Sequence, residues 1–222
     1  ARDILSSFIP QLIKSNKQVF PRVNPIDSSL IEPDLESVIS PGISGISVGK
    51  IESSKDVLLI SSIIDRIEKK QGIATNRIQL IPWIESPKAI INAYEICISS
   101  PRIVAVAFGA EDFCADMGIL RDTDMEINAN ESNLIHPRSS IAIAAKVAGI
   151  HAIDTPYTSY KDKEGLLSEV KLAKAFGYRG KFAIHPDQVK VINESFYPND
   201  KEISWARKIV SAAKQSNKSG IG

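Results

Sequence analysis

Charged side chains stand at the ends of short apolar segments of this chain, where parallel α/β proteins place their chemistry. Two of them are carboxylates that follow apolar runs: Glu85 in "IPWIES" and Asp112 in "VAFGAEDF". Two carboxylates, together with water and substrate oxygens, commonly hold Mg²⁺, because that ion prefers oxygen ligands and keeps part of its hydration shell. We therefore interpret Glu85 and Asp112 as a metal-binding pair.

The other apolar segments also end in polar residues. These are Arg22 and Asn24, Lys50 and Glu52, Glu111 beside Asp112, Asp154, and His185. A polar residue after a strand usually just meets solvent or caps the next helix. Buried carboxylates are costly unless they are paired or bind metal, so six such ends together favour a site for a divalent cation and an anionic substrate.

Gly109 and Ala110 leave the backbone uncovered just before the acids of "AFGAEDF". Their N–H groups could approach a substrate carboxylate, although a tight turn explains the two small residues equally well. Trp83, two residues before Glu85, is predicted to line the interior of a barrel as a packing aromatic rather than a substrate platform. Asp116 is predicted to support the site or the fold rather than to bind the metal.

Other kinds of metal site are not indicated. The three histidines are scattered, and the chain has no CxxC or HExxH motif. Cys97 and Cys114 lack metal-ligand spacing and are too few for a disulfide framework, so a reducing compartment is expected. That compartment is the cytoplasm, or the mitochondrial matrix in a eukaryote.

The polar residues need a scaffold that brings strand ends together. Short apolar runs alternate with segments of helical period, a pattern typical of a parallel α/β fold. The predicted strands are residues 18–23, 45–48, 78–84, 103–108, 150–153 and 181–184. The predicted helices are residues 56–70, 87–99, 139–148, 163–176, 186–194 and 201–214, with an amphipathic helix at the start of the chain.

The spacing of these strands indicates which α/β fold is present. Their ends lie about 32 residues apart, close to the roughly 31 expected for (β/α)₈ TIM barrels, but only about six βα units can be counted. The alternatives are an open six-stranded sheet and an incomplete TIM barrel; we favour the barrel, because the chain opens in mid-helix. No composition shift divides the chain, so residues 1–222 are predicted to form a single domain.

Charge and hydropathy exclude some partners. The chain has 27 Lys and Arg against 26 Asp and Glu, a net charge of +1, so no broad attraction to nucleic acid or to an anionic membrane is implied. No apolar run approaches the roughly 20 residues that span a bilayer. We expect a small-molecule substrate.

Four segments together resemble one known family, the citrate lyase beta-subunit-like branch of the HpcH/HpaI aldolase superfamily. The resemblance is carried by "IPWIESPKAIINAYEICISSPRIVAVAFGAEDFCADMGI", by "PRSSIAIAAKVAGIHAIDTPYTSYKD" and "GYRGKFAIHPDQVKVIN", and by "VFPRVNP" upstream. It covers nearly the whole chain, with these motifs in the family's order and spacing.

The resemblance implies a Mg²⁺-dependent TIM barrel, usually a homotrimer or hexamer. It implies an enzyme that cleaves or forms carbon–carbon bonds in short 3-hydroxyacyl-CoA thioesters such as malyl-CoA or citramalyl-CoA, with acetyl-CoA and a 2-oxo acid as products. Matched by motif, Glu85 and Asp112 are the metal carboxylates, and Arg22 contacts the substrate's oxyanion or carboxylate. The residues that fall on substrate-binding strand ends are Lys50, Asp154 and His185.

The sequence also departs from the family pattern. The family's first two strands would precede Ala1, and its C-terminal segment, with an Asp that acts as acid or base, would follow Gly222, so we expect part of a longer chain. Gly49 stands where the family often has Pro. Two alternatives stay open: a class II aldolase acting on free 2-oxo acids without CoA, and a catalytically degenerate barrel that serves as an assembly subunit.

Overall fold

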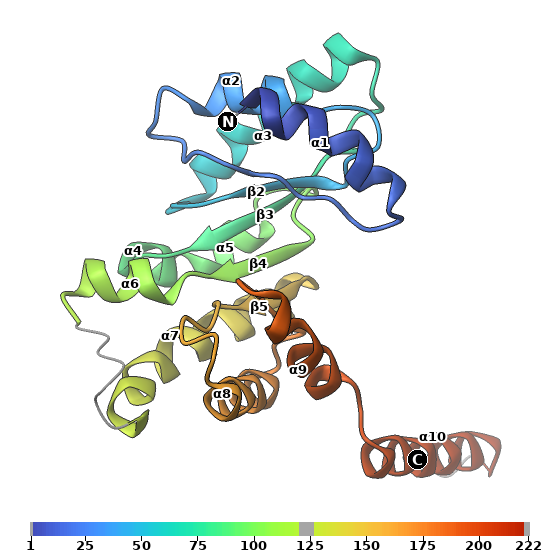
Figure 1. Cartoon of the computed structure of the whole chain (residues 1–222). Helices are drawn as coiled ribbons and strands as arrows, with labels where there is room; N and C mark the ends of the chain where they lie inside the picture. The colour runs from blue at the N-terminus through green and yellow to red at the C-terminus, as the bar shows by residue number, and fades with distance from the viewer. Residues whose placement is uncertain (1, 120–126, 220–222) are drawn as a thin grey trace.

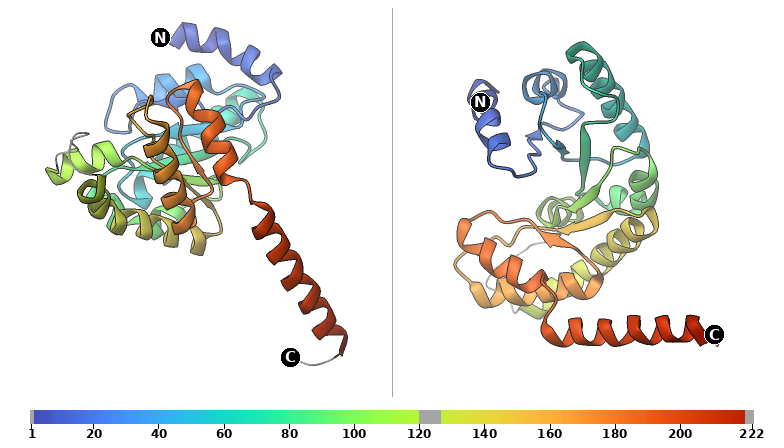
Figure 2. Two further views of the ribbon diagram at one scale, coloured as in Figure 1. Left: turned by 60° about the horizontal axis from the view of Figure 1, so that its bottom comes forward. Right: turned by 90° about the vertical axis from the view of Figure 1, so that its right-hand side faces the viewer.

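Six parallel strands form one sheet in chain order, as the sequence predicts. The computed structural model describes residues 2–119 and 127–219. The strands are β1 (Arg22–Val23), β2 (Gly45–Val48), β3 (Gln79–Ile84), β4 (Ala105–Phe108), β5 (His151–Asp154) and β6 (Gly180–Lys181), paired in the order β1-β2-β3-β4-β5-β6. In the right-hand view of Figure 2 the sheet curves into an arc that does not close. The fold is therefore an open portion of a barrel.

Most of the helices lie on the convex side of this arc, and the last helix, α10, extends away from it (Figures 1 and 2). The helices are α1 (Arg2–Lys14), α2 (Ile31–Val38), α3 (Ser54–Gln71), α4 (Pro87–Ile91), α5 (Ala93–Ile98), α6 (Ala110–Met117), α7 (Ile127–Ala148), α8 (Lys163–Phe176), α9 (Pro186–Phe196) and α10 (Asp200–Ser219). Because every strand runs in the same direction, the loops that follow the strands gather at one end of the sheet, beside the C-terminal ends of the strands. The site is expected there.

Local sequence explains how the main helices begin and end. Ser53 caps α3: its side chain accepts a hydrogen bond from the Asp56 N–H, and the Asp56 carboxylate accepts one from the Ser53 N–H. Gly72 ends the helix in the left-handed conformation. After β3, Ser86 caps α4 and Pro87 occupies its first turn. The chain is thereby forced to turn immediately after Glu85.

Several predicted element boundaries were wrong. The edge strands β1 and β6 are shorter than predicted; Pro21 has no N–H to continue the β1 ladder. The predicted helix 87–99 is divided at Asn92 into α4 and α5. Helix α7 begins twelve residues before the predicted start and contains Pro137, which we had placed outside the helix. Helix α2 was not predicted; it is short and has no side-chain cap.

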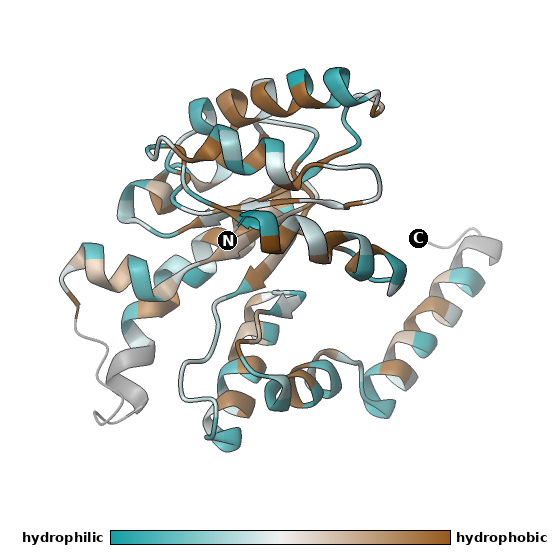
Figure 3. Ribbon diagram, turned by 45° about the horizontal axis from the view of Figure 1, so that its top comes forward, coloured by the Kyte–Doolittle hydropathy of each residue, from teal (hydrophilic) through white to brown (hydrophobic). Residues whose placement is uncertain are grey.

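Three clusters of buried apolar residues are present in the described part of the chain; one, made of Leu166, Val170 and Ile192, lies between α8 and α9, and the other two pack on the sheet. The larger lies between the sheet and the outer helices and includes Ile46, Ile64, Ile84 and Phe108, all fully or nearly fully buried. The smaller lies on the concave side of the sheet, and its buried members are Ile81, Trp83, Ala105 and Ala107. In Figure 3 the apolar colouring gathers on the strands and on the inward sides of the helices. The sheet is thus held from both faces, as in a barrel.

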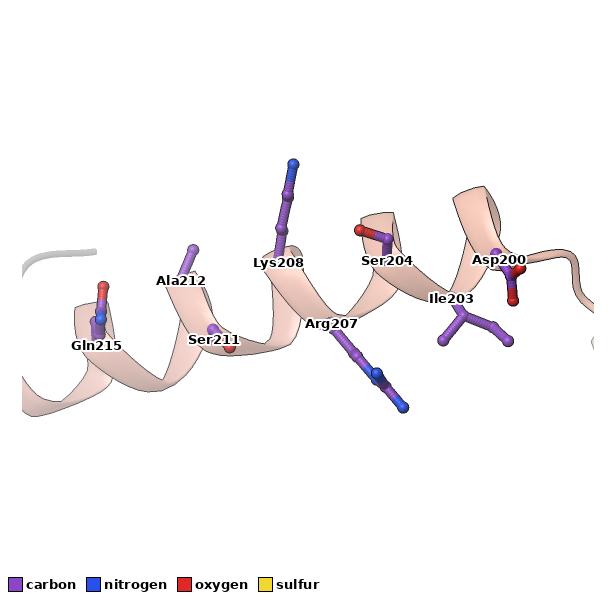
Figure 4. Close-up of a pocket in the computed structure, with 8 residues that line it drawn as sticks. All are labelled: Asp200, Ile203, Ser204, Arg207, Lys208, Ser211, Ala212 and Gln215. Atoms are coloured by element: carbon purple, nitrogen blue, oxygen red, sulfur yellow. The ribbon is translucent and has the colours of Figure 1, made fainter.

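Helix α10 stands away from the rest of the fold (Figure 2). None of the side chains of residues 200–216 is buried, and Trp205 is 67% exposed. Figure 4 shows the eight side chains along this helix that line a shallow hollow of 620 Å³. All eight come from one exposed helix, so this hollow is not enclosed in the way a small-molecule site usually is. Within the described residues, no helix is both long and apolar enough to cross a membrane.

Candidate active site

Glu85 is a buried carboxylate immediately after β3. The residue is only 4% exposed. Its Oε2 accepts a hydrogen bond of 2.8 Å from the Lys50 N–H, and its Oε1 accepts one of 3.2 Å from Nη2 of Arg22. The sharp turn made by Ser86 and Pro87 keeps the side chain at the end of the strand.

The electrostatic surroundings of Glu85 leave its negative charge undercompensated. Burial raises the pKa of Glu85, and the nearby Asp112 carboxylate raises it further. The Lys50 N–H and the Arg22 guanidinium oppose this shift but do not reverse it. A buried acid in this condition is stabilised by any cation that reaches it.

Asp112 lies in the first turn of α6 and faces the same pocket as Glu85. The pocket has a volume of 560 Å³, and its lining residues are Ile26, Asp27, Lys50, Glu52, Asp56, Glu85, Ser86, Asp112, Ala115 and Asp116. Asp112 is exposed, whereas Glu85 is buried. The structure therefore brings the two predicted carboxylates to one cavity, with Asp116 beside them.

Two other acids of the pocket already have partners. Glu52 accepts hydrogen bonds of 2.9 Å from both Ser86 Oγ and Lys88 Nζ, and Lys88 is the main cause that lowers the pKa of Glu52. Asp56 Oδ2 accepts the N–H groups of Ser53 and Glu52. These acids shape the rim. The sequence did not indicate Asp56 as a pocket residue, because it lies inside a helix start and not at a strand end. The folded chain brings it to the pocket.

Two glycines make room for the Glu85 side chain. A Cβ atom at Gly109 would lie 2.3 Å from Glu85 Cγ, and one at Gly49 would lie 3.0 Å from Glu85 Oε2. Such a distance at Gly109 is impossible for a real side chain without displacement of Glu85. Glycine at these positions therefore permits a buried carboxylate to lie against the backbone.

The contacts of the Gly109 and Ala110 amides agree with the structural alternative of a tight turn, and substrate binding by these two residues stays a prediction. The Gly109 N–H donates to the Ile84 carbonyl at 3.0 Å, and the Ala110 N–H donates to Thr155 Oγ1 at 3.2 Å. Both donors have acceptors inside the protein. Local sequence did not reveal this, because the acceptors lie on β3 and after β5.

The carboxylate pair fits a divalent cation. Among the described residues, no three His, Cys, Asp or Glu side chains come together as a ready-made metal cluster. Two carboxylates with the remaining positions left to water and substrate is the arrangement common for Mg²⁺. The undercompensated charge of Glu85 and the acidic, open side of the pocket at Asp112 suit such an ion.

Comparison with known proteins places the chain in a family. The family model described as HpcH/HpaI aldolase/citrate lyase matches residues 1–186. The chain belongs to the HpcH/HpaI aldolase/citrate lyase family. The resemblance inferred from the sequence motifs is thus confirmed.

Relatives within this family carry the names of lyases. The citrate lyase subunit beta of Haemophilus influenzae is 36% identical over 90% of this chain and 67% of its own length. The mitochondrial citramalyl-CoA lyase of Rattus norvegicus is 30% identical over 90% of this chain and 60% of its own length. The chain thus spans about two thirds or less of the length of these relatives.

A solved structure supports the fold. The crystal structure of CitE from Mycobacterium tuberculosis in complex with magnesium, acetoacetate and coenzyme A has a TM-score of 0.68 and 25% identity, covering 87% of this chain and 66% of that one. The prediction of an incomplete α/β barrel is confirmed by this likeness and by the open six-stranded sheet.

Arg22 has the surroundings of an accessible cation held by an aromatic ring. Its guanidinium lies 4.4 Å from the centroid of Trp83, and its side chain is 52% exposed. Trp83 is itself buried: its ring stacks on Phe182 with centroids 4.4 Å apart, and its Nε1–H donates to Ser47 Oγ at 2.7 Å. Trp83 therefore packs the barrel interior, as predicted, and orients Arg22 beside Glu85.

Lys50 reaches the site through its backbone. Its φ of 54° lies in the left-handed region, which is uncommon for a residue with a side chain, and its N–H donates to Glu85. The residue also lines the pocket. Its role in substrate binding within this family stays a prediction.

Asp154 lies in a buried charge cluster rather than in the pocket. Its Oδ2 accepts a hydrogen bond of 2.7 Å from Lys181 Nζ and its Oδ1 accepts one of 3.0 Å from Arg138 Nε, and Lys181 also contacts Glu169 at 2.6 Å. Burial alone would raise the pKa of Asp154, but Lys181 and Arg138 outweigh it and hold the pKa below its usual value. This carboxylate is fully buried, and its contacts with Lys181 and Arg138 are those of a residue that stabilises the fold. Contact between Asp154 and the substrate stays a prediction.

His185 is not among the residues that line the pocket. Its Nδ1 accepts the Asp187 N–H at 3.3 Å, capping α9, and its ring stacks on Tyr160 with centroids 4.7 Å apart. These contacts agree with the structural alternative for this histidine. Substrate binding by His185 stays a prediction.

Proposed function

We propose that this protein is a Mg²⁺-dependent carbon–carbon lyase. It would cleave or form a short 3-hydroxyacyl-CoA, such as malyl-CoA or citramalyl-CoA, with acetyl-CoA and a 2-oxo acid on the other side of the reaction. The observation that carries the proposal is the pairing of buried Glu85 with Asp112 in one pocket, beside the Arg22 guanidinium. The names of the relatives and the magnesium and coenzyme A in the CitE structure support it.

The proposed roles follow from the placement of each side chain. Glu85 and Asp112 would hold Mg²⁺, which when bound supplies a Lewis acid for the hydroxyl and carboxylate oxygens of the substrate. Arg22, held over Trp83 but half exposed, can place its positive charge near the thioester enolate that leaves when the carbon–carbon bond breaks. Lys50 presents its backbone N–H to Glu85 and so helps to fix that carboxylate.

We further propose that the protein acts as a homotrimer or hexamer. Its proposed compartment is the cytoplasm or, in a eukaryote, the mitochondrial matrix. Light scattering coupled to size-exclusion chromatography measures the assembly directly. A monomeric molar mass at assay concentration would contradict the oligomer.

An activity assay tests the proposal. The protein is incubated with Mg²⁺ and malyl-CoA, citramalyl-CoA or citryl-CoA, and acetyl-CoA release is followed by chromatography. We expect release from at least one thioester and none after chelation of the metal. Cleavage of free hydroxy acids without any effect of CoA would favour the aldolase, and no cleavage together with no Mg²⁺ binding would favour the assembly subunit.

Two carboxylate variants localise the activity. Glu85→Gln should abolish turnover, because it removes the charge on the buried side of the proposed metal site. Glu95→Gln is the matched control, since Glu95 is an exposed acid on α5 that lies outside the pocket. Metal-dependent turnover that survives in Glu85→Gln would exclude Glu85 as a metal ligand.

A further inference from the structure

The start of α6 has no side-chain cap of its own, although it carries Asp112. Gly109 occupies the capping position and has no side chain, and no cap hydrogen bond forms there. The first N–H groups of a helix have no partner within the helix and need acceptors elsewhere. The position of Asp112 therefore depends on the groups that hold the first residues of α6.

Two hydrogen bonds hold this helix start, and they come from two strands. The Gly109 N–H donates to the carbonyl of Ile84, the residue before Glu85, at 3.0 Å. The Ala110 N–H donates to Thr155 Oγ1, directly after β5, at 3.2 Å. The first hydrogen bond joins α6 to β3, which precedes Glu85, and the second joins it to the residue that follows β5. Strands β3 and β5 are the two neighbours of β4 in the sheet. Together the two hydrogen bonds set the Asp112 backbone relative to Glu85.

Thr155 is well placed to act as a fixed anchor. It is 0% exposed, and it follows Asp154, whose carboxylate is held by Lys181 and Arg138. Ala110 is also fully buried. Loss of the Thr155 hydroxyl would leave the Ala110 N–H buried without an acceptor, which is unfavourable enough to move the helix start toward water.

We propose that Thr155 is a positioning residue for the metal carboxylate Asp112. Its buried hydroxyl holds the N-terminus of α6 so that Asp112 and Glu85 face one cation together. This inference rests on the proposed Mg²⁺ site. It assigns Thr155 no contact with the metal or the substrate.

Calorimetric titration of Mg²⁺ into three variants and the unmodified protein tests the role. Thr155→Val keeps the shape and removes the acceptor, and we expect Mg²⁺ binding to weaken roughly tenfold, at the lower end of what outer partners of metal ligands contribute. Thr155→Ser keeps the hydroxyl and should restore affinity to within about twofold. An unchanged Mg²⁺ affinity in Thr155→Val would overturn the inference.

Ser100→Ala is the matched control. The Ser100 hydroxyl also accepts a buried backbone N–H, from Arg102 at 3.3 Å, but it lies before β4, at the other end of the sheet. We expect this variant to lower the thermal midpoint and to leave Mg²⁺ affinity unchanged. If Ser100→Ala and Thr155→Val weakened Mg²⁺ binding equally, the effect would be general destabilisation and the proposed role would be wrong.

A second measurement covers the case in which Thr155→Val does not fold. In the unmodified protein the Ala110 amide should exchange with deuterium at least as slowly as the Phe113 amide, which bonds inside the helix to Gly109. Rapid exchange at Ala110 would overturn the inference. If the unmodified protein bound no Mg²⁺, the proposed function itself would fail, and slow exchange at Ala110 would show that the anchor is present without a metal to position.

Discussion

Glu85 immediately follows β3, Asp154 is the last residue of β5, and the two carboxylates have opposite surroundings. Both carboxylates are buried. Asp154 meets two buried cations, which lower its pKa, whereas Glu85 meets one half-exposed arginine and a backbone N–H, and its pKa is raised. A buried acid with full partners holds the fold together. A buried acid with too few partners is ready to bind a cation.

The largest expected effect comes from Asp154→Asn. Removal of this charge leaves Lys181 and Arg138 buried with less compensation, so the free energy of unfolding should fall by about 3–5 kcal/mol. Urea denaturation followed by circular dichroism measures it. Glu85→Gln, in the same assay, should cost little or increase stability, because it removes a buried charge that is poorly compensated. A larger loss for Glu85→Gln than for Asp154→Asn would reverse the comparison.

Gly109→Ala should weaken Mg²⁺ binding roughly tenfold or more, the effect of disturbing the support of a metal ligand. The added Cβ would collide with Glu85 Cγ and force the carboxylate away from the pocket. The control is Gly180→Ala, whose Cβ would lie 3.8 Å from Ile153, an ordinary contact. Titration calorimetry compares the two, and equal affinities would show that Gly109 does not position Glu85.

The two acids should respond to pH in opposite directions. The folded-state pKa of Asp154 is lowered, so its stabilising contribution is present above its unfolded pKa and is lost as pH falls. The folded-state pKa of Glu85 is raised, so its contribution is present below its unfolded pKa and is lost as pH rises through the folded value. As pH rises above the ordinary glutamate pKa, in metal-free buffer, Glu85→Gln should therefore become progressively more stable relative to the unmodified protein, which must ionise a buried carboxyl group.

Unfolding titrations at several pH values check this opposition. Asp154→Asn, if it folds, should keep a constant stability deficit relative to the unmodified protein above the ordinary aspartate pKa. The deficit should shrink as pH falls below that value, because the unmodified protein then loses the contribution of the Asp154 charge. Parallel trends for the two variants would contradict the assigned surroundings.

The smallest expected change in the free energy of unfolding comes from substituting Arg22, the cationic partner of Glu85. Arg22→Gln breaks an ion pair whose arginine is 52% exposed, and the free energy of unfolding should change by less than about 1 kcal/mol. Lys181→Met, which removes a fully buried cation from Asp154 and Glu169, should cost several times more. Similar costs in urea denaturation would mean that exposure does not distinguish the two sites.

The sequence predicted the elements and the meeting of Glu85 and Asp112 at one pocket better than it predicted the partners of buried charges. Strand β3 and the acid that follows it are local features, so Glu85 was found from the apolar run and its end. The same reasoning placed Asp154 in the pocket, because its cations, Arg138 and Lys181, come from other elements and are not near it in sequence. The cationic partners of a strand-end acid decide whether it is structural, and those partners depend on the assembled fold.

Backbone donors were the other feature that the sequence did not reveal. For Gly109 and Ala110 the sequence left open substrate binding through their amides and a tight turn, and it did not reveal that these amides donate to Ile84 and Thr155. Thr155 was not selected at all, because a single hydroxyl after a strand is common and its acceptor role requires the neighbouring strand. Strand boundaries failed at the sheet edges, where pairing from one side only gives shorter strands, and helix boundaries failed at α7 and at Asn92.

Titration of Mg²⁺ into the unmodified protein, Glu85→Gln, Asp112→Asn and Glu95→Gln tests the central claim most directly. We expect saturable binding with one ion per chain in the unmodified protein and in Glu95→Gln, and no detectable binding in either of the other two variants. Folding of each variant is checked by circular dichroism. Unchanged Mg²⁺ affinity in folded Glu85→Gln or Asp112→Asn would show that these two carboxylates do not form the metal site.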